Sequence, residues 1–278
     1  MTGQDKTYYG NSDRIWHSLA QRGQQAAGNP AAEGSALLDP PVFTSAEAQR
    51  QDSLRRLAAS FRVFAKLGYE EGVMGHISFR DPEFPDRFWM NPFGLSFALV
   101  RVRDLMCITL DGQVVHGGGF PHIGGVPQHS AVYRANPDIQ SVAHTHSAAG
   151  KAWSVFGRPL RPISTEAAVF HGRHVVYDTH LHGERESLGA AAAGNRAVIM
   201  QNHGILTTGS TVDETVYLFL SLEKVCAEQL IAEQIGGALT IPEEAVERIS
   251  AHFDAYRGWL NFQPTYQAIV REQPDLLQ

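Results

Sequence analysis

The sequence has little cysteine, few charged residues and no long apolar run, and each shortage excludes a class of protein. Only Cys107 and Cys226 occur in 278 residues, which excludes a disulfide framework and a paired-cysteine metal motif. Both are expected to be buried apolar residues in a reducing compartment. Charged residues make up 19% of the chain, the net charge is −6, and lysine and arginine do not cluster. This composition argues against nucleic acid or an anionic membrane surface as a partner.

The apolar runs are far shorter than a membrane-spanning helix, so no membrane partner is expected. Residues 1–6 lack the apolar core of a signal peptide, and a cytoplasmic location is therefore predicted. Residues 1–44 are rich in glycine, glutamine, asparagine, alanine and proline and have weak periodicity. We predict an N-terminal arm there, extended or partly disordered, that lies over a neighbouring subunit. Residues 45–278 are predicted to form a single domain with a C-terminal helical tail.

Helix and strand patterns alternate along this domain, which predicts an α/β or α+β class. A helix is expected from a cap at Thr44 or Ser45 to Gly68, because apolar residues recur between them at helical spacing. Asp111-Gly112 predicts a hairpin turn between two short strands. Residues 166–171 fit a helix or a strand equally well. Further helices are predicted at residues 128–136, 147–156, 185–193 and 211–235 and after Pro242.

Histidine is the one abundant functional residue, with 13 copies. His144 and His146 end an apolar run, and the two-residue period of a strand would place both imidazoles on one face. His203 follows a second apolar run, Ala197–Met200. Two strands that each deliver imidazole at their ends predict a metal site.

Several short motifs, taken in order, resemble the class II aldolase/adducin family over roughly residues 50–237. They are Gly75-His76-Ile77-Ser78, Asn91-Pro92-Phe93-Gly94, His129 placed 15 residues before His144, the pair His144 and His146, and Gln201-Asn202-His203-Gly204 before a long helix. The resemblance implies a three-layer α/β/α fold around a mostly antiparallel sheet, with residues 45–278 as the catalytic domain. It also implies a divalent metal on His144, His146 and His203, and a homotetramer with sites near subunit interfaces.

The sequence departs from the family pattern where the sugar-phosphate enzymes read Ser-Ser-Glu. Residues 123–125 here are Ile-Gly-Gly, so the acid/base carboxylate is missing. The phosphate-binding Gly-Asn and Ser-Gly pairs of the family become Gly75-His76 and Phe93-Gly94. A phosphate dianion needs several donors or cations to offset its desolvation, and a sugar phosphate is therefore not expected.

We instead expect an apolar or aromatic small-molecule substrate. The predicted substrate-binding residues are His76, Phe93, Gly94 and His129, with Trp89 and Phe120 as further aromatic contacts. His129 is more typical of a helix residue that orients the site than of a metal ligand.

This pattern also resembles the branch of the family that contains the non-haem iron oxygenases of aminocoumarin antibiotic pathways, the clorobiocin/novobiocin type. Those enzymes oxidatively decarboxylate a prenylated 4-hydroxyphenylpyruvate, and then the derived mandelate, to a benzoate. The resemblance implies an oxygenase that uses Fe(II) and O2 on an aromatic 2-oxo or 2-hydroxy acid. Fe(II) is favoured over Zn(II) or Mn(II) because aldol chemistry needs a proton acceptor that residue 125 no longer supplies, although three histidines suit either metal.

Two other functions stay open at this point. One is a Zn- or Mn-dependent lyase or epimerase acting on an unphosphorylated hydroxy-carbonyl compound. Its acid/base group would be Glu166, with His171 close behind in the sequence. The other is an adducin-like scaffold without catalysis, against which the intact histidine set argues. His180 and His182 are interpreted as surface-loop residues, and His122 as a residue of a lid or a plain loop.

Overall fold

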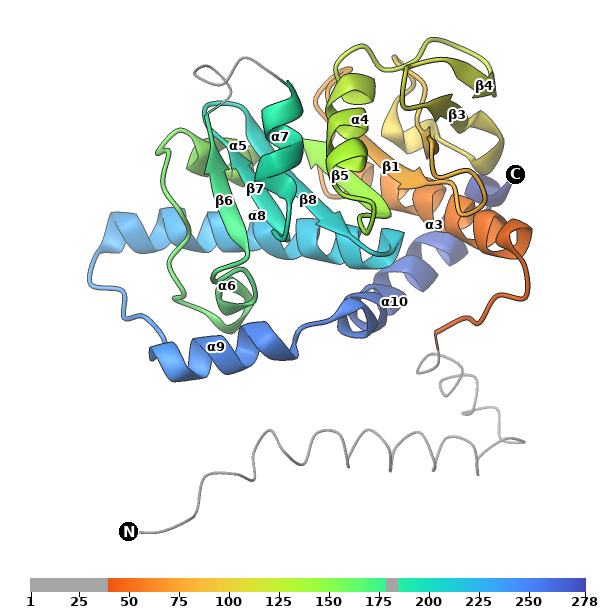
Figure 1. Ribbon diagram of the computed structural model, residues 1–278. Coiled ribbons are helices and arrows are strands. Elements are labelled where there is room, and N and C mark those ends of the chain that lie inside the picture. Colours follow the sequence, from red (N-terminus) through yellow and green to blue (C-terminus); the bar gives the residue numbers. More distant parts are fainter. Residues whose placement is uncertain (1–39, 179–184) are drawn as a thin grey trace, which may run out of the picture. The chain divides into compact units, whose positions relative to one another are not determined.

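A sheet of eight strands lies between two layers of helices in the computed structural model, which describes residues 40–178 and 185–278 (Figure 1). The strand order is β4-β3-β2-β1-β5-β8-β7-β6, and only the neighbours β6 and β7 run parallel. The strands are β1 (His76–Arg80), β2 (Arg87–Met90), β3 (Met106–Thr109), β4 (Val114–His116), β5 (Ser141–Thr145), β6 (His174–Tyr177), β7 (Ala197–Met200) and β8 (Gly204–Gly209). The predicted three-layer α/β/α fold with a mostly antiparallel sheet is confirmed.

The α-helices of the described part are α3 (Ala46–Lys66), α4 (Gly125–Ala135), α5 (Ala148–Ser154), α6 (Thr165–Val169), α7 (Arg185–Ala192), α8 (Val212–Ile235), α9 (Glu243–His252) and α10 (Ala255–Glu272). In the described part of the chain, short 3-10 helices span Phe97–Leu99, Val102–Asp104 and Pro274–Leu277. Helices α3, α8 and α10 contribute to one apolar core, and α4 and α7 to the other, on opposite faces of the sheet (Figure 1). None of the described helices combines the length and apolarity needed to cross a bilayer.

Helix α3 follows its sequence signals closely. The Ser45 hydroxyl accepts a hydrogen bond from the Ala48 amide at 3.1 Å, which caps the first turn. Leu57, Phe61 and other apolar residues of one face are fully buried. Gly68 has a φ of +74° just past the helix end, a conformation that favours glycine. Residues 1–39 lie outside the described residues, and the N-terminal arm stays a prediction.

Both cysteines are buried in the apolar core, as predicted from their isolation in the sequence. Burial raises the pKa of Cys107 to about 11, and it raises the pKa of Cys226 further still. Both thiols are therefore protonated at neutral pH and act as packing groups.

The alternation of side chains along the two central strands decides what faces helix α4. On β5, Ala143 packs into the α3/α8 core and Val142 into the α4/α7 core. His144, two residues after Val142, therefore faces the α4 layer. On β1, Ile77 belongs to the α3/α8 core. The residues on either side of it, His76 and Ser78, therefore face α4.

Candidate metal centre

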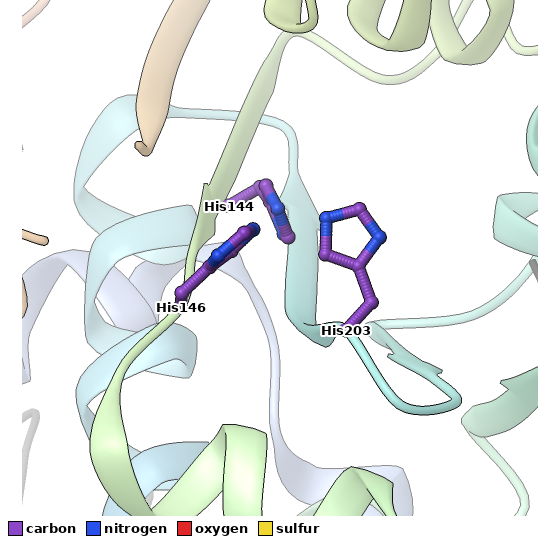
Figure 2. Close-up of side chains that lie close together, drawn as sticks. All are labelled: His144, His146 and His203. Carbon is purple, nitrogen blue, oxygen red and sulfur yellow. The ribbon is translucent and has the colours of Figure 1, made fainter. Parts of the chain in front are cut away.

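The three histidines predicted as ligands lie together at the ends of the neighbouring strands β5 and β7/β8. His144 is in β5, His146 follows the same strand, and His203 is in the turn between β7 and β8. Their rings converge on a common centre (Figure 2), and their candidate ligand nitrogens all lie within 4.8 Å of one another. The ring centroids are 4.7 to 5.2 Å apart. The strand period and the loop together therefore assemble three imidazoles from segments about 60 residues apart in sequence.

Hydrogen bonding fixes the tautomer of His144. Its Nδ1 lies 2.8 Å from the carbonyl oxygen of Ile205, which can only accept, so Nδ1 carries the proton. The lone pair of Nε2 is left free to bind a metal. Burial, with the neighbouring His203 and His146 adding to it, lowers the pKa of His144 well below its ordinary value. The ring is thus neutral at pH 7, as ligation requires.

The Asn-His-Gly sequence around His203 reflects a tight backbone approach. Asn202 has a φ of +57°, a left-handed conformation that asparagine tolerates better than most residues. A Cβ at Gly204 would lie 2.7 Å from the carbonyl oxygen of Thr145 in the neighbouring strand β5. Only glycine therefore lets β8 begin close enough to β5 to bring His203 to His144.

His76 fills the space where residue 125 would carry a side chain. It pairs with His144 across β1 and β5, and the two ring centroids are 5.1 Å apart. A Cβ built on Gly125 would lie 2.7 Å from Cγ and Cδ2 of the His76 ring. The absence of a side chain at residue 125 and the presence of the imidazole at residue 76 are therefore one structural feature.

A buried chain of hydrogen bonds supports His76 from behind. Its Nδ1 lies 2.7 Å from Nε2 of His129, whose Nδ1 lies 2.5 Å from the Ser78 hydroxyl. That hydroxyl lies 2.6 Å from the hydroxyl of Tyr133. His129 has no exposed surface, and burial lowers its pKa to about 3. His129 therefore contacts His76 and Ser78 and has no surface open to a bound molecule.

His122 and Phe93 lie next to His76 and extend the same side of the site. His122 is buried, accepts a hydrogen bond from the Gly125 amide at 2.9 Å, and donates from Nε2 to the Val73 carbonyl oxygen at 3.0 Å. It is thus a fixed cap on α4, and the lid interpretation of His122 is wrong. The half-buried Phe93 ring meets the His122 ring edge-on at 5.3 Å, beside the exposed Gly94.

The other two aromatic candidates behave differently. Phe120 is 78% exposed, and its carbonyl accepts from the Phe93 amide at 2.8 Å, which places it near the site. Trp89 belongs to the α3/α8 core, and its indole N–H donates to Asp81 at 2.8 Å. Trp89 therefore faces away from the histidines, and its expected substrate contact is wrong.

The structure does not bring Glu166 and His171 to the three histidines. Both belong to the α6 region, where Glu166 is exposed and His171 pairs with Glu243 of α9 at 2.9 Å. Strand β6 begins just after Glu166 and His171 and runs parallel to β7. Both residues therefore lie at the N-terminal ends of β6 and β7. His203 lies after the end of β7, at the opposite end. His180 and His182 lie outside the described residues.

One carboxylate that no sequence motif indicated approaches the three histidines. Glu71 Oε2 is 4.0 Å from Nδ1 of His146, which is an ion-pair distance but too long for a hydrogen bond. Lys151 holds the same carboxylate at 2.7 Å and lowers the pKa of Glu71 by hydrogen bonding. Glu71 and Lys151 are 80 residues apart, and both side chains are half-exposed in the structure. Nothing in its own segment distinguishes either residue from other charged residues of the sequence.

Glu223 of helix α8 is a second residue that the sequence did not reveal. Its buried carboxylate accepts hydrogen bonds from the Ser147 hydroxyl at 2.5 Å and from the Ala149 and Gly150 amides at 2.8 and 2.7 Å. These donors belong to the segment directly after His146. Glu223 therefore anchors the start of α5 and, through it, the position of His146.

The donor set fits a divalent transition metal. The imidazole of His144 presents a free lone pair, and burial lowers the pKa of His146 as well, which favours its neutral form. Three neutral imidazoles leave the charge of a divalent ion uncompensated and its remaining coordination positions open, which suits anionic ligands.

Comparison with known proteins agrees with this geometry. Residues 55–230 match the family described as class II aldolase and adducin N-terminal domain. The chain is 32% identical to a 4-hydroxy-3-prenylphenylpyruvate oxygenase/4-hydroxy-3-prenylbenzoate synthase of Streptomyces roseochromogenus subsp. oscitans, over 85% of this chain and 88% of that protein. It is 31% identical to the decarboxylase NovR of Streptomyces niveus, over 85% and 91%.

A solved structure has the same architecture. The L-fuculose 1-phosphate aldolase from Glaciozyma antarctica PI12 superposes with a TM-score of 0.82 at 35% identity, covering 87% of this chain and 98% of that one. Family match, sequence relatives and fold thus agree, and the chain belongs to the class II aldolase and adducin family.

Proposed function

We propose that this protein is a non-haem Fe(II) oxygenase that oxidatively decarboxylates an aromatic 2-oxo or 2-hydroxy acid. The observation that carries the proposal is the packing at residue 125. The position has no carboxylate, and the ring of His76 leaves no room for one. Proton abstraction next to a carbonyl, which aldol and epimerase chemistry require, has no base at this place.

The residues of the chain have distinct tasks in this proposal. His144, His146 and His203 hold the metal, and His76 and Phe93 form the wall beside it. When bound, Fe(II) supplies a centre with open positions for a bidentate acid and for dioxygen. The half-buried Phe93 ring offers an apolar surface to an aromatic side chain.

The two Streptomyces relatives support this substrate class. Their names describe an oxygenase of a prenylated phenylpyruvate and a decarboxylase, at 32% and 31% identity over 85% of this chain. A 2-oxo acid of this type and one O2 would give the 2-hydroxy acid one carbon shorter and one CO2. That hydroxy acid and a second O2 would give the benzoate, CO2 and water.

Oxygen uptake tests the proposal. The protein is first loaded with Fe(II) under anaerobic conditions and is then given oxygen and substrate. With 4-hydroxyphenylpyruvate or its ring-prenylated form it should consume O2 and release CO2 in equal amounts. His203→Ala should abolish uptake, whereas His116→Ala, an exposed histidine on the far edge strand β4, should not change it. No uptake across a panel of aromatic 2-oxo and 2-hydroxy acids would refute the proposal.

A Zn- or Mn-dependent lyase on an unphosphorylated hydroxy-carbonyl compound is the second candidate. It is favoured by Glu71, whose carboxylate lies 4.0 Å from His146, and by the likeness to a solved aldolase. This function predicts turnover without oxygen that Glu71→Gln abolishes and the exposed α9 variant Glu247→Gln leaves intact. Glu166→Gln belongs in the same series, because loss of turnover there would assign the base to the residue predicted from the sequence.

We also propose that the protein is a homotetramer. Large apolar side chains are exposed on two segments next to the site, with Val73 and Met74 at 45 and 46% and Phe120 and Ile123 at 78 and 73%. The hydrogen bond from His122 to the Val73 carbonyl joins the two segments. Such a patch favours coverage by another subunit. A monomer of 30.5 kDa by light scattering would contradict this assembly.

A further inference from the structure

We infer that the hydrogen-bond chain from Tyr133 to His76 has one fixed direction, which makes Nε2 of His76 a permanent N–H donor for a carboxylate bound beside the three histidines. The identity of that carboxylate as part of an aromatic 2-oxo acid rests on the proposed function. The donor itself does not. It follows from the four residues Tyr133, Ser78, His129 and His76 and from what each can donate or accept.

The chain is built by two matching periodicities. His76 and Ser78 are two apart on strand β1 and share one face, while His129 and Tyr133 are four apart on helix α4 and share another. The two faces interlock through contacts of 2.7, 2.5 and 2.6 Å. All four side chains are buried, so each hydrogen at these three contacts must find an acceptor among the four residues.

The terminal tyrosine sets the direction. Burial raises the pKa of Tyr133, so its hydroxyl keeps its proton, and Ser78 is the hydrogen-bond partner of that hydroxyl among the described residues. If Tyr133 donates to Ser78, then Ser78 donates to Nδ1 of His129, and Nε2–H of His129 donates to Nδ1 of His76. Every donor at the three contacts is then paired, and the one remaining hydrogen is on Nε2 of His76.

The opposite direction leaves a buried donor without a partner. His76 would donate to His129, His129 to Ser78, and Ser78 to Tyr133, whose own proton would then have no acceptor in the described structure. The penalty for an unpaired buried hydroxyl favours the first direction by roughly tenfold or more.

The first direction determines what His76 can do in the site. Because Nδ1 accepts, the single proton of the neutral ring is on Nε2. This nitrogen has no hydrogen-bond partner among the described residues. It is not shut off from the surface as a fully buried unpaired atom would be, so a ligand can reach it. A nitrogen that carries a proton neither binds a metal nor accepts a proton. His76 is therefore a substrate-binding donor, and His129, Ser78 and Tyr133 are the residues that position it.

Nitrogen NMR on the Zn(II)-loaded, 15N-histidine-labelled protein tests the tautomer directly. We expect His76, assigned by its loss in His76→Gln, to show protonated Nε2 and unprotonated Nδ1 at about 90% or more of the population. Ser78→Ala should mix the tautomers by removing the link to Tyr133. Ser60→Ala should not, because this equally buried hydroxyl on α3 donates to the Arg56 carbonyl oxygen, away from the hydrogen-bond chain. Protonated Nδ1 in the wild type would overturn the inference.

Calorimetry on the same Zn(II)-loaded protein tests the ligand. Affinity for 4-hydroxyphenylpyruvate should fall about tenfold or more in His76→Phe, which keeps the ring but loses the N–H, and it should largely survive in His76→Gln. Binding of 4-hydroxyphenylacetone, which lacks the carboxylate, should not respond. Equal acid affinity in all three proteins would overturn the carboxylate assignment. Correct tautomer and binding without oxygen uptake by the Fe(II) protein would instead refute the proposed function alone.

Discussion

Adding one methyl group at residue 125 should destabilise the protein, although alanine is normally a better helix residue than glycine. In Gly125→Ala the new Cβ would lie 2.7 Å from two ring carbons of His76, where ordinary contacts exceed 3.4 Å. Overpacking of this kind costs about 1–3 kcal/mol. The gain in helix propensity is at most about 1 kcal/mol. The net loss should therefore be about 1–2 kcal/mol.

A second substitution isolates this contact. In a His76→Ala background, the nearest remaining His76 atom is Cβ, at 3.2 Å from the added methyl group. Gly125→Ala should then cost almost nothing, which gives a coupling of about 1–2 kcal/mol between the two sites. Gly124→Ala is the matched control, since its added Cβ would meet only His122, at 3.9 Å.

The assay is urea unfolding of five metal-free proteins: the wild type, Gly125→Ala, His76→Ala, the double variant and Gly124→Ala. Their free energies of unfolding are compared with a common dependence on urea concentration. Using metal-free protein keeps changes in metal affinity out of the measurement. A coupling within about 0.5 kcal/mol of zero would refute the reasoning. Gly125→Ala and Gly124→Ala proteins of equal stability would refute it as well.

Three further predictions concern the support of the site and the fold. Burial alone would raise the pKa of Asp81, but hydrogen bonds from Arg50, Trp89 and two backbone amides lower it to about 2. The resulting stability, on the order of 2 kcal/mol, is complete above about pH 4 and lost as the pH falls toward 2, and Asp81→Asn should flatten this dependence in acid urea titrations. Glu223→Gln should cost about 1–3 kcal/mol and weaken metal binding in a chelator competition, because an amide cannot accept all three hydrogen bonds, whereas the exposed Glu228→Gln on the same helix should not. Zn(II) at 1,000 times its Kd should stabilise the protein by about 4 kcal/mol in thermal unfolding, and no shift would contradict the site.

The sequence was sufficient where the determining interactions are local or periodic. The two-residue period of β5 aligned His144 with His146, and the Ser45 cap located the start of α3. The ordered motifs brought His203 into the same set. These features depend on backbone geometry that a short segment determines by itself.

The sequence was not sufficient where the outcome depends on strand direction. Strand β6 was not predicted, because its four residues lack a clear alternating pattern. Its parallel pairing with β7 places the α6 region at the opposite end of the strands from His203. The expectation that Glu166, with His171 after it, could supply an acid/base group beside the metal came from the family resemblance, and the structure places both residues elsewhere.

Contacts between residues far apart in the chain could not be predicted from the sequence for a similar reason. The Gly125–His76 packing, the His76–His129 hydrogen bond and the Glu71–Lys151 pair join residues about 50 to 80 positions apart. None of these residues is unusual in its own segment, and only the assembled sheet and helix layers bring them together. A missing carboxylate could be read from the sequence, but what replaced it could not.

The replacement itself bears on the choice of substrate. A carboxylate at residue 125 would put negative charge beside the metal position, where it would repel a substrate carboxylate and accept protons. The arrangement found here is neutral and, with the tautomer inferred for His76, presents an N–H donor at the same place. A donor beside three neutral imidazoles stabilises an anionic acid and does nothing to remove its protons. The packing of His76 against Gly125 therefore supports the proposed binding of an acid and offers no base for deprotonating a sugar.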